Sequence, residues 1–200
     1  MLLLIAIYPA AYLLGSIPSS VWLGKWFRGI DLRDHGSGNA GATNAFRVLG
    51  KGIGTLVLIM DMLKGYAAVS LAFFQTGISP EGEEWMLLRI TLGIAAIIGH
   101  IWPVFAGFRG GKGVAATAGI GLALHPLAAL SALGIYVLVF AKGKISSLGS
   151  LAAVLSYPVW MILVFKAEYT SLKVFSLLVP ILVFTTHRKN IRRLLERKEG

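Results

Sequence analysis

The sequence predicts an all-α, polytopic integral membrane protein with about seven transmembrane helices. Of its 200 residues, 56% are hydrophobic, and the mean hydropathy is +0.75; both values exceed what a soluble domain of this length needs to fill one core. A helix needs ~20 apolar residues to cross the hydrocarbon of a bilayer. Four runs come close to that length and predict four spans: 2–24, 53–76, 85–106 and 170–186.

The run 113–141 is too long for one ordinary span, so it is either one overlong helix or two short helices hinged at Pro126. The distribution of Lys and Arg decides, because short basic loops stay on the cytoplasmic side. A single crossing would move Lys142, Lys144 and the basic tail to the outside. Two short helices keep the basic loops together. With a further span over 150–165, this predicts seven spans, an external N-terminus and a cytoplasmic C-terminus.

Composition also limits the classes of function. The first residues carry no positively charged leader, so we expect them to remain as a helix rather than to be cleaved as a signal peptide. No cysteine is present, which excludes disulfides, thiolate metal sites and thiol nucleophiles. The net charge of +10 could suggest nucleic acid, but the basic residues lie at predicted helix ends, where membrane orientation and anionic headgroups explain them. We expect one membrane domain over residues 1–200 and no nucleic-acid partner.

The first polar segment, RDHGSGNAGATNAFRVLGKG, contains glycines spaced as in a dinucleotide-binding loop, at Gly36, Gly38 and Gly41. That motif requires a preceding strand, whereas this one follows a predicted membrane helix. Glycine-rich backbone can still expose N–H groups that bind anions, and Arg47 can bind a phosphate through two hydrogen bonds. Neutral donors stand between them: Ser37, Asn39, Thr43 and Asn44. The segment predicts a phosphate site, and the alternative is a flexible connector.

The second polar segment, FAGFRGGKGVAATAG, also combines glycines with a cation. It is not a nucleotide P-loop, because Ala106 and Gly113 stand where that motif needs Gly and Ser or Thr. A glycine loop that leads into a helix is still a good anion site. Gly110, Gly111, Lys112 and Gly113 are therefore candidate phosphate-binding residues, with a simple orientation signal as the alternative.

The tail THRKNIRRLLERKEG predicts an amphipathic helix at the same face of the membrane. His187 and Asn190 are three residues apart and so project together, either toward a ligand or as capping groups. Within the second span, Asp61 and Lys64 are expected to pair, because a lone charge at that depth is costly. Lys64 is a candidate substrate-binding residue, and a purely structural pair is the alternative. For His100 a structural role is favoured over a catalytic one.

The motifs GSGNAGATN, GGKGVA and HRKNIRRL, together in one multi-spanning chain of this length, resemble the bacterial glycerol-3-phosphate acyltransferases that use acyl phosphate, the PlsY family. The resemblance implies seven helices in the bacterial cytoplasmic (inner) membrane, with the active site facing the cytoplasm. It implies transfer of a fatty acyl group to the 1-hydroxyl of sn-glycerol 3-phosphate, giving lysophosphatidic acid and phosphate in the first acylation of phospholipid synthesis. It implies no cofactor and no metal. The partners would be the two substrates, membrane lipids and, transiently, the enzyme that supplies acyl phosphate.

Carried over position by position, the motifs imply catalytic roles for Ser37, Arg47, Lys112 and His187. Another set of residues is implied to bind the substrates and their phosphates: Gly36, Gly38, Asn39, Gly41, Thr43, Asn44, Lys64, Gly110, Gly111, Gly113, Ser150 and Asn190. Lys64 is included because of its position and not because of a motif.

The residues also narrow the mechanism. Another acyltransferase class uses a His with an Asp five residues later, and none of the four histidines is followed by Asp at that spacing. An acyl-enzyme on Ser37 would need a nearby base, and only His35 is close in sequence. Because acyl phosphate is already activated, direct transfer by positioning and oxyanion stabilisation is the favoured hypothesis. A transporter and a lipid-phosphate hydrolase are the rival functions; the chain shows neither repeated halves nor clustered carboxylates.

Overall fold

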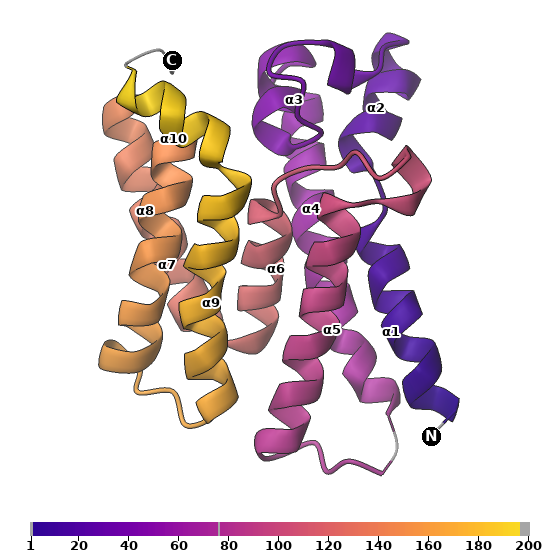
Figure 1. Cartoon of the computed structure of the whole chain (residues 1–200), viewed down its shortest axis with the longest axis vertical. Helices are drawn as coiled ribbons and strands as arrows, with labels where there is room; N and C mark the ends of the chain where they lie inside the picture. Colours follow the sequence, from indigo (N-terminus) through magenta and orange to yellow (C-terminus); the bar gives the residue numbers. More distant parts are fainter. Residues whose placement is uncertain (1, 76, 197–200) are drawn as a thin grey trace.

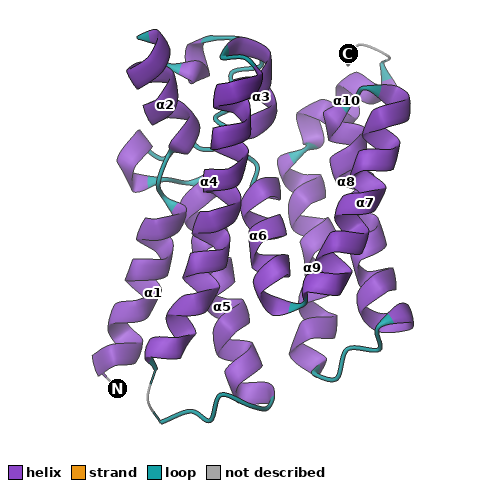
Figure 2. Ribbon diagram, turned by 180° about the vertical axis from the view of Figure 1, so that it is seen from behind, coloured by secondary structure: helices purple, strands orange, loops and turns teal. Residues whose placement is uncertain are grey.

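The computed structural model describes residues 2–75 and 77–196, and these form a bundle of helices without a strand. Figure 1 shows helices that run up and down the bundle, with connections gathered at its two ends. α1 (Leu2–Gly15) starts at the lower end, and α10 (Arg188–Leu195) lies at the upper end. Figure 2 shows the same two groups of loops from behind. The all-α prediction is confirmed.

The predicted helix over 2–24 is in fact broken into α1 and α2 (Ser19–Arg28). Pro18 stands at the break and has no N–H to continue the helical hydrogen-bond ladder. The carbonyl of Ile17, next to the break, accepts hydrogen bonds from Ser19 N (3.0 Å) and from Lys64 Nζ (2.8 Å). The prediction of one uninterrupted helix was therefore wrong.

The helices that follow carry the two glycine-rich segments at the upper end of the bundle (Figure 1). α5 ends at a Trp-Pro pair, because Pro103 cannot donate to the ladder. The elements in order are the 3-10 turn η1 (Leu32–Asp34), α3 (Ala42–Val48), α4 (Lys51–Ser70), the 3-10 turn η2 (Leu71–Phe74), α5 (Glu83–Ile101) and the 3-10 turn η3 (Val104–Ala106).

The region 113–141 forms two helices, α6 (Val114–Leu124) and α7 (Pro126–Gly143), as the charge argument predicted. Pro126 occupies the first position of α7, where a missing N–H costs nothing. The ring of His125 completes the turn, since its Nδ1 accepts a hydrogen bond of 3.2 Å from Ala128 N. His125 is thus a helix cap.

The C-terminal quarter consists of two helices in contact and a bent end. α8 (Ser146–Pro158) continues into a π-helical turn, η4 (Val159–Val164), at the point where Pro158 interrupts the regular ladder. α9 (Thr170–Thr186) matches the predicted run, and α10 turns away from it by 68°.

Four of the described helical segments are long and apolar enough to cross a membrane, or five if α9 and α10 are counted as one bent span. Two more apolar helices, Ala6–Gly15 within α1 and the whole of α6, are shorter. Large apolar side chains such as Leu63, Leu138 and Leu163 are more than half exposed on the outside of the bundle. Such a surface suits a lipid environment rather than water.

Glycines bring α4 and α6 into close contact. Gly65 on α4 lies against the carbonyl of Ala116, and Gly119 on α6 lies against that of Met62, so neither position has room for a Cβ. Small residues at such crossings let membrane helices pack backbone to backbone. This packing holds the start of α6, and with it the second polar segment, beside the first.

Candidate active site

Asn44, in the first turn of α3, shapes the first polar segment. Its Oδ1 accepts a hydrogen bond of 2.9 Å from Ser37 N, and its Nδ2 donates to the carbonyls of Leu32 (3.2 Å) and His35 (3.0 Å). The side chain is only 1% exposed. Gly36 has a φ of +60° and no room for a Cβ beside Asn44 Oδ1. Asn44 therefore holds the loop in shape and presents Ser37, and its amide is already engaged.

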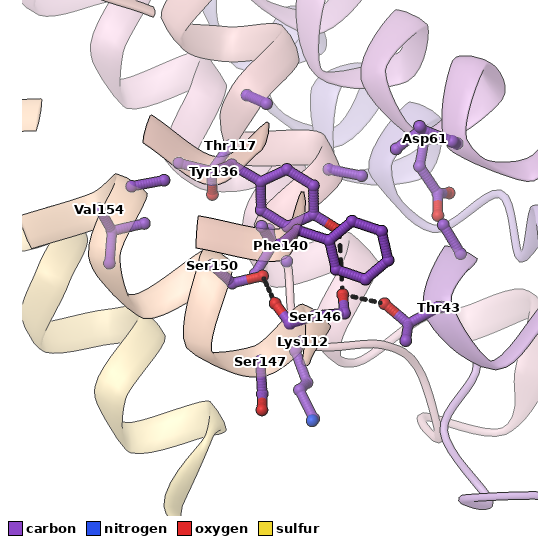
Figure 3. A pocket seen from close by; sticks show the side chains of 18 of the residues that line it. Thr43, Asp61, Lys112, Thr117, Tyr136, Phe140, Ser146, Ser147, Ser150 and Val154 are labelled. Carbon is purple, nitrogen blue, oxygen red and sulfur yellow. Dashed lines mark hydrogen bonds between the residues drawn. The ribbon is translucent and has the colours of Figure 1, made fainter. Parts of the chain in front are cut away.

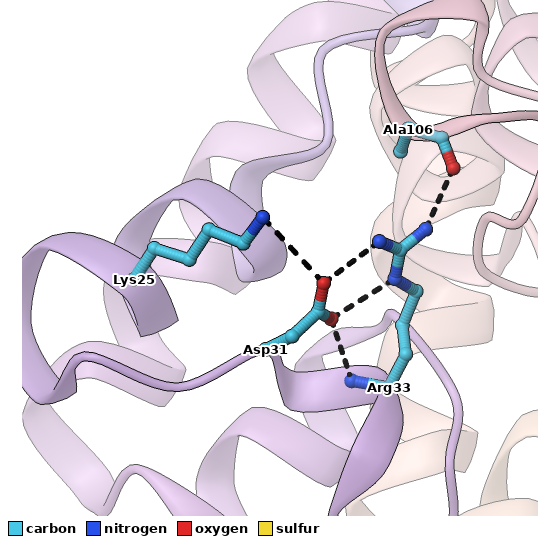
Figure 4. Close-up of polar contacts among 4 residues, drawn as sticks. All are labelled: Lys25, Asp31, Arg33 and Ala106. Atoms are coloured by element: carbon cyan, nitrogen blue, oxygen red, sulfur yellow. Dashed lines mark hydrogen bonds and ion pairs between the residues drawn. The ribbon is translucent and has the colours of Figure 1, made fainter.

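Arg33 joins the two polar segments to each other, as Figure 4 shows. Its guanidinium donates to both carboxylate oxygens of Asp31, at 2.9 and 2.7 Å, and to the carbonyl of Ala106 at 2.6 Å. These hydrogen bonds hold the pKa of the Asp31 carboxyl well below its usual value, although burial opposes the shift. Asp31 in turn raises the pKa of Arg33. In sequence Arg33 was only one of many basic loop residues, so this clamp was not predicted.

Gly110 and Gly111 attach the second polar segment to the end of α5. Gly111 N donates to the carbonyl of His100 (3.1 Å), and Gly110 N donates to that of Ile101 (3.2 Å). A Cβ at either position would collide with His100. Their N–H groups are thus used within the protein, which favours a packing role over the expected phosphate contacts.

Lys112 meets the C-terminal motif. Its Nζ donates to Asn190 Oδ1, and its carbonyl accepts from Thr186 Oγ1 at 3.1 Å. His187 Nδ1 lies 2.8 Å from the carbonyl of Val183, which can only accept, so Nδ1 carries the proton and a neutral ring has its lone pair on Nε2. His187 and Asn190 are buried, at 3% and 7% exposure. The second and third motifs therefore form one polar wall.

The start of α8 brings a set of hydroxyl groups to the same place (Figure 3). Ser146 Oγ lies 2.9 Å from Thr43 Oγ1 and 3.1 Å from Tyr136 Oη, and the Ser146 carbonyl accepts from Ser150 Oγ at 2.9 Å. Ser147 Oγ is buried and has no hydrogen-bond partner in the part of the chain described. Ser150 was predicted, whereas Ser146, Ser147 and Tyr136 were not; three serines at a helix start beside basic residues were the available signal.

A single cavity of about 970 Å³ connects these groups. Its lining includes eleven of the predicted site residues: Ser37, Asn39, Gly41, Thr43, Asn44, Arg47, Lys112, Gly113, Ser150, His187 and Asn190. The lining does not include Gly36, Gly38, Lys64, Gly110 or Gly111. It adds cations that were not singled out as site residues: Lys51, Lys144 and Arg193.

Lys64 lies in a buried polar cluster beneath the first segment. Its Nζ is 2.8 Å from Asp61 Oδ1, and both side chains are at most 5% exposed. Asp61 Oδ1 also accepts from Ser19 Oγ at 3.0 Å, and His100 Nδ1 lies 3.8 Å from it. Together with the bond to Ile17, this arrangement ties the α1–α2 break to α4. It favours the structural alternative for Lys64, although Asp61 and His100 do reach the cavity wall.

The arrangement suits the binding of anions. Five cations, several hydroxyls and the start of α6 at Gly113 face one cavity, and the lining contains Asp61 as its one carboxylate among the described residues. Within those same residues, no three His, Asp or Glu side chains lie close enough together to hold a metal ion. Preorganised donors of this kind stabilise phosphoryl groups and developing oxyanions.

Comparisons with known proteins identify the family. The family model described as glycerol-3-phosphate acyltransferase matches residues 4–197. A glycerol-3-phosphate acyltransferase of Chlorobium phaeobacteroides is 40% identical and aligns over 100% of this chain and 97% of its own. One of Geobacillus kaustophilus is 44% identical, over 94% and 91% of the two chains.

Two solved structures of PlsY, an integral membrane glycerol 3-phosphate acyltransferase, have the same fold. The glycerol 3-phosphate form superposes with a TM-score of 0.87 at 35% identity, covering 98% of this chain and 94% of that one. The lysophosphatidic acid form gives 0.85 at 34% identity with the same coverage. The chain belongs to the glycerol-3-phosphate acyltransferase family and is an integral membrane acyltransferase of the PlsY type.

Proposed function

We propose that the chain transfers a fatty acyl group from acyl phosphate to the 1-hydroxyl of sn-glycerol 3-phosphate, releasing lysophosphatidic acid and phosphate as the first acylation of phospholipid synthesis. The observation that carries the proposal is the shape of the cavity. Its polar end collects Arg47, Lys112 and the start of α6, and its other end runs between α6, α7 and α8 over apolar side chains. A phosphate-bearing head and an apolar tail fit such a site together.

The proposed orientation has seven spans in the bacterial inner membrane, with the polar end of the cavity toward the cytoplasm, an external N-terminus and a cytoplasmic C-terminus. The seven would be α1, α4, α5, α6, α7, α8 with η4, and α9. The basic loops support this orientation, because short Lys- and Arg-rich loops stay on the cytoplasmic side. The described helices form one bundle, and the cavity is lined from several of them, which supports a single domain over residues 1–200.

The phosphoryl groups of the two substrates would lie side by side at the polar end. One would be held by Ser37, Asn39, Thr43 and Arg47 of the first motif, and the other by Lys112 with His187 and Asn190. Arg47 can bind a phosphate through two parallel hydrogen bonds, whereas Lys112 acts as a point charge. Gly113 and Ser150 complete the wall, and Asn44, Gly36 and Gly38 act by holding the loop in shape.

The proposed step is direct transfer without an acyl-enzyme. The 1-hydroxyl oxygen attacks the acyl carbonyl carbon, the bond from that carbon to the phosphate oxygen breaks, and the departing phosphate takes the hydroxyl proton. Ser37 and loop N–H groups would donate hydrogen bonds to the tetrahedral oxyanion. Ser37 is exposed in the loop and bonded through its backbone to Asn44, an arrangement that suits a hydrogen-bond donor. A trapped acyl-Ser37, or ping-pong kinetics, would contradict direct transfer.

The test is phosphate release by the purified protein in detergent or lipid, with palmitoyl phosphate as donor, with and without sn-glycerol 3-phosphate. Palmitoyl-CoA is the control donor. Release that requires glycerol 3-phosphate and yields lysophosphatidic acid supports the proposal. Release without the acceptor would indicate a hydrolase, and transfer from palmitoyl-CoA alone would overturn the donor assignment. No phosphate release with any donor, together with solute movement across sealed vesicles, would indicate a transporter.

Contact with the enzyme that supplies acyl phosphate belongs to the same proposal. A poorly soluble acyl donor is best passed on near the membrane surface where it is consumed. The exposed basic residues of α10 and of the α7–α8 connection lie at that end of the bundle (Figure 1). Crosslinking of the two proteins in membranes would test the contact, and its absence would remove this partner without affecting the chemistry.

A further inference from the structure

Small residues form part of the wall at the apolar end of the cavity. On α6, Ala118 and Gly121 are three residues apart and so face the same way, and on α7 the wall is formed by Ala129 and Ala132. Tyr157, on α8, is the large side chain of this region and is 5% exposed. At a rise of ~1.5 Å per residue, Gly121 lies roughly 12 Å along α6 from Gly113. The small residues thus leave a chamber well below the phosphate-binding end.

An aromatic pair separates this chamber from the polar end. Tyr136 and Phe140 stack with ring centroids 5.8 Å apart and an angle of 8° between the rings. Figure 3 shows the two rings beside Ser146, to which Tyr136 is bonded at 3.1 Å. Both rings line the cavity nearer the polar end of α7 than Ala129 does. A slim, unbranched chain can pass beside flat rings and then lie in the chamber.

Gly121 lies in the cavity wall beside Ala129 and Tyr157. A methyl group on Gly121 would lie 3.3 Å from Ala129 Cβ and 3.6 Å from Tyr157 Oη, so it would point at both side chains. Tyr157 Oη has no hydrogen-bond partner within the described ranges, so no bond fixes the ring against a larger neighbour. A larger side chain at position 121 needs space beside Ala129 and Tyr157, and all three residues line the cavity, so the new side chain or the displaced ring takes volume from the end of the chamber.

We propose that Gly121, facing Ala129 and Tyr157, sets the length of the acyl chain that the enzyme accepts. This inference rests on the proposed function, because it assigns the chamber to the tail of the acyl donor. A valine at position 121 adds three carbon atoms, which displaces about two to three methylenes of a bound chain in a close-packed site. Each methylene withdrawn from water contributes about fourfold to affinity, so the preference for long over short donors should fall at least tenfold.

The experiment measures kcat/KM for dodecanoyl, tetradecanoyl, hexadecanoyl and octadecanoyl phosphate in wild type, Gly121→Val and Tyr157→Leu. The ratio of hexadecanoyl to dodecanoyl should fall at least tenfold in Gly121→Val. The ratio of octadecanoyl to hexadecanoyl should rise in Tyr157→Leu, which shortens the opposing side chain. Gly134→Val on α7 is the matched control, because position 134 is exposed, has open space around it and lies outside the cavity lining; its profile should equal that of wild type.

An unchanged profile in Gly121→Val, including an equal loss with every donor, would overturn the inference. So would the same shift in Gly134→Val. If Gly121→Val does not give a monodisperse protein in detergent, Gly121→Ala decides by the same ratio, with an expected shift of about fourfold for one methylene. A wild-type enzyme that uses no acyl phosphate would instead overturn the proposed function, and this inference with it.

Discussion

The buried ion pair between Asp61 and Lys64 provides the most demanding test of the fold. Lys64→Met removes the cation and leaves the Asp61 carboxylate, 3% exposed, with Ser19 as its remaining hydrogen-bond donor. Leaving one buried charge without its partner typically costs about 3 to 5 kcal/mol. The carbonyl of Ile17 at the α1–α2 break also loses the hydrogen bond from Lys64 and keeps only the one from Ser19 N. We therefore expect Lys64→Met to be strongly destabilised.

A double variant separates the cost of the unpaired charge from the cost of the lost hydrogen bonds. In Asp61→Leu/Lys64→Met no charge is left unpaired, and replacing a buried pair by apolar side chains is often neutral. Ser19 Oγ remains without a partner, which costs about 1 to 3 kcal/mol for a buried group, whereas the Ile17 carbonyl keeps its hydrogen bond from Ser19 N. The double variant should therefore recover part of the stability lost in Lys64→Met.

Thermal unfolding in detergent measures these differences. For a chain of this size, 3 to 5 kcal/mol corresponds to roughly 6 to 20 °C in the apparent Tm. Lys51→Met is the control, because Lys51 is exposed at the start of the same helix, and it should change stability by less than about 0.5 kcal/mol. A double variant at least as unstable as Lys64→Met would refute the reasoning, and so would a Lys64→Met variant with the Tm of wild type.

Three further predictions concern the polar end. Arg47→Ala and Lys112→Ala should each lower turnover at least tenfold with membrane insertion intact, because one charge-assisted contact is worth about 1.5 to 3 kcal/mol; near-normal kinetics in both would contradict the proposed phosphate sites. Asn44→Ala leaves Ser37 N without its partner and leaves the Leu32 and His35 carbonyls with one backbone hydrogen bond each, so limited proteolysis should cut the first segment faster, and equal protection would contradict its shaping role. The pKa of Asp31 is lowered by Arg33, so this pair stabilises the fold fully above the unfolded-state pKa of about 3.9. Its contribution is lost as the pH falls through the lower pKa of the folded state. Asp31→Asn should therefore make the free energy of unfolding depend less on pH at acidic pH, and an unchanged dependence would contradict a stabilising role for the pair.

Local signals in the sequence predicted most helices. The apolar runs gave α4, α5 and α9, and the charge argument divided 113–141 at Pro126, where the structure has the α6–α7 turn. The break in 2–24 was missed although Pro18 was visible, because a proline in an apolar run can equally be accommodated within a helix, as Pro9 is within α1. The interruption is stabilised by Lys64, 47 residues further along the chain.

The sequence predicted which residues lie at the site better than it predicted what each of them does there. Eleven predicted residues line the cavity, since glycines, hydroxyls and cations near helix ends are the groups that bind phosphate. The sequence did not show which of these residues face the cavity and which hold the loops in place. Gly110 and Gly111 turned out to pack against His100, and Arg33, one basic residue among many, clamps two loops together.

The sequence by itself determined that this chain lies in a membrane, that its basic and glycine-rich segments gather at one end, and which family its motifs resemble. These properties depend on composition, local charge and short spacing. The tertiary structure alone decided that Thr43 and Ser146, 103 residues apart, share a hydrogen bond, and that Gly121 lies beside Ala129 and Tyr157 in the cavity wall. Such contacts arise from how helices cross and pack, and short-range patterns do not encode which side chains then meet.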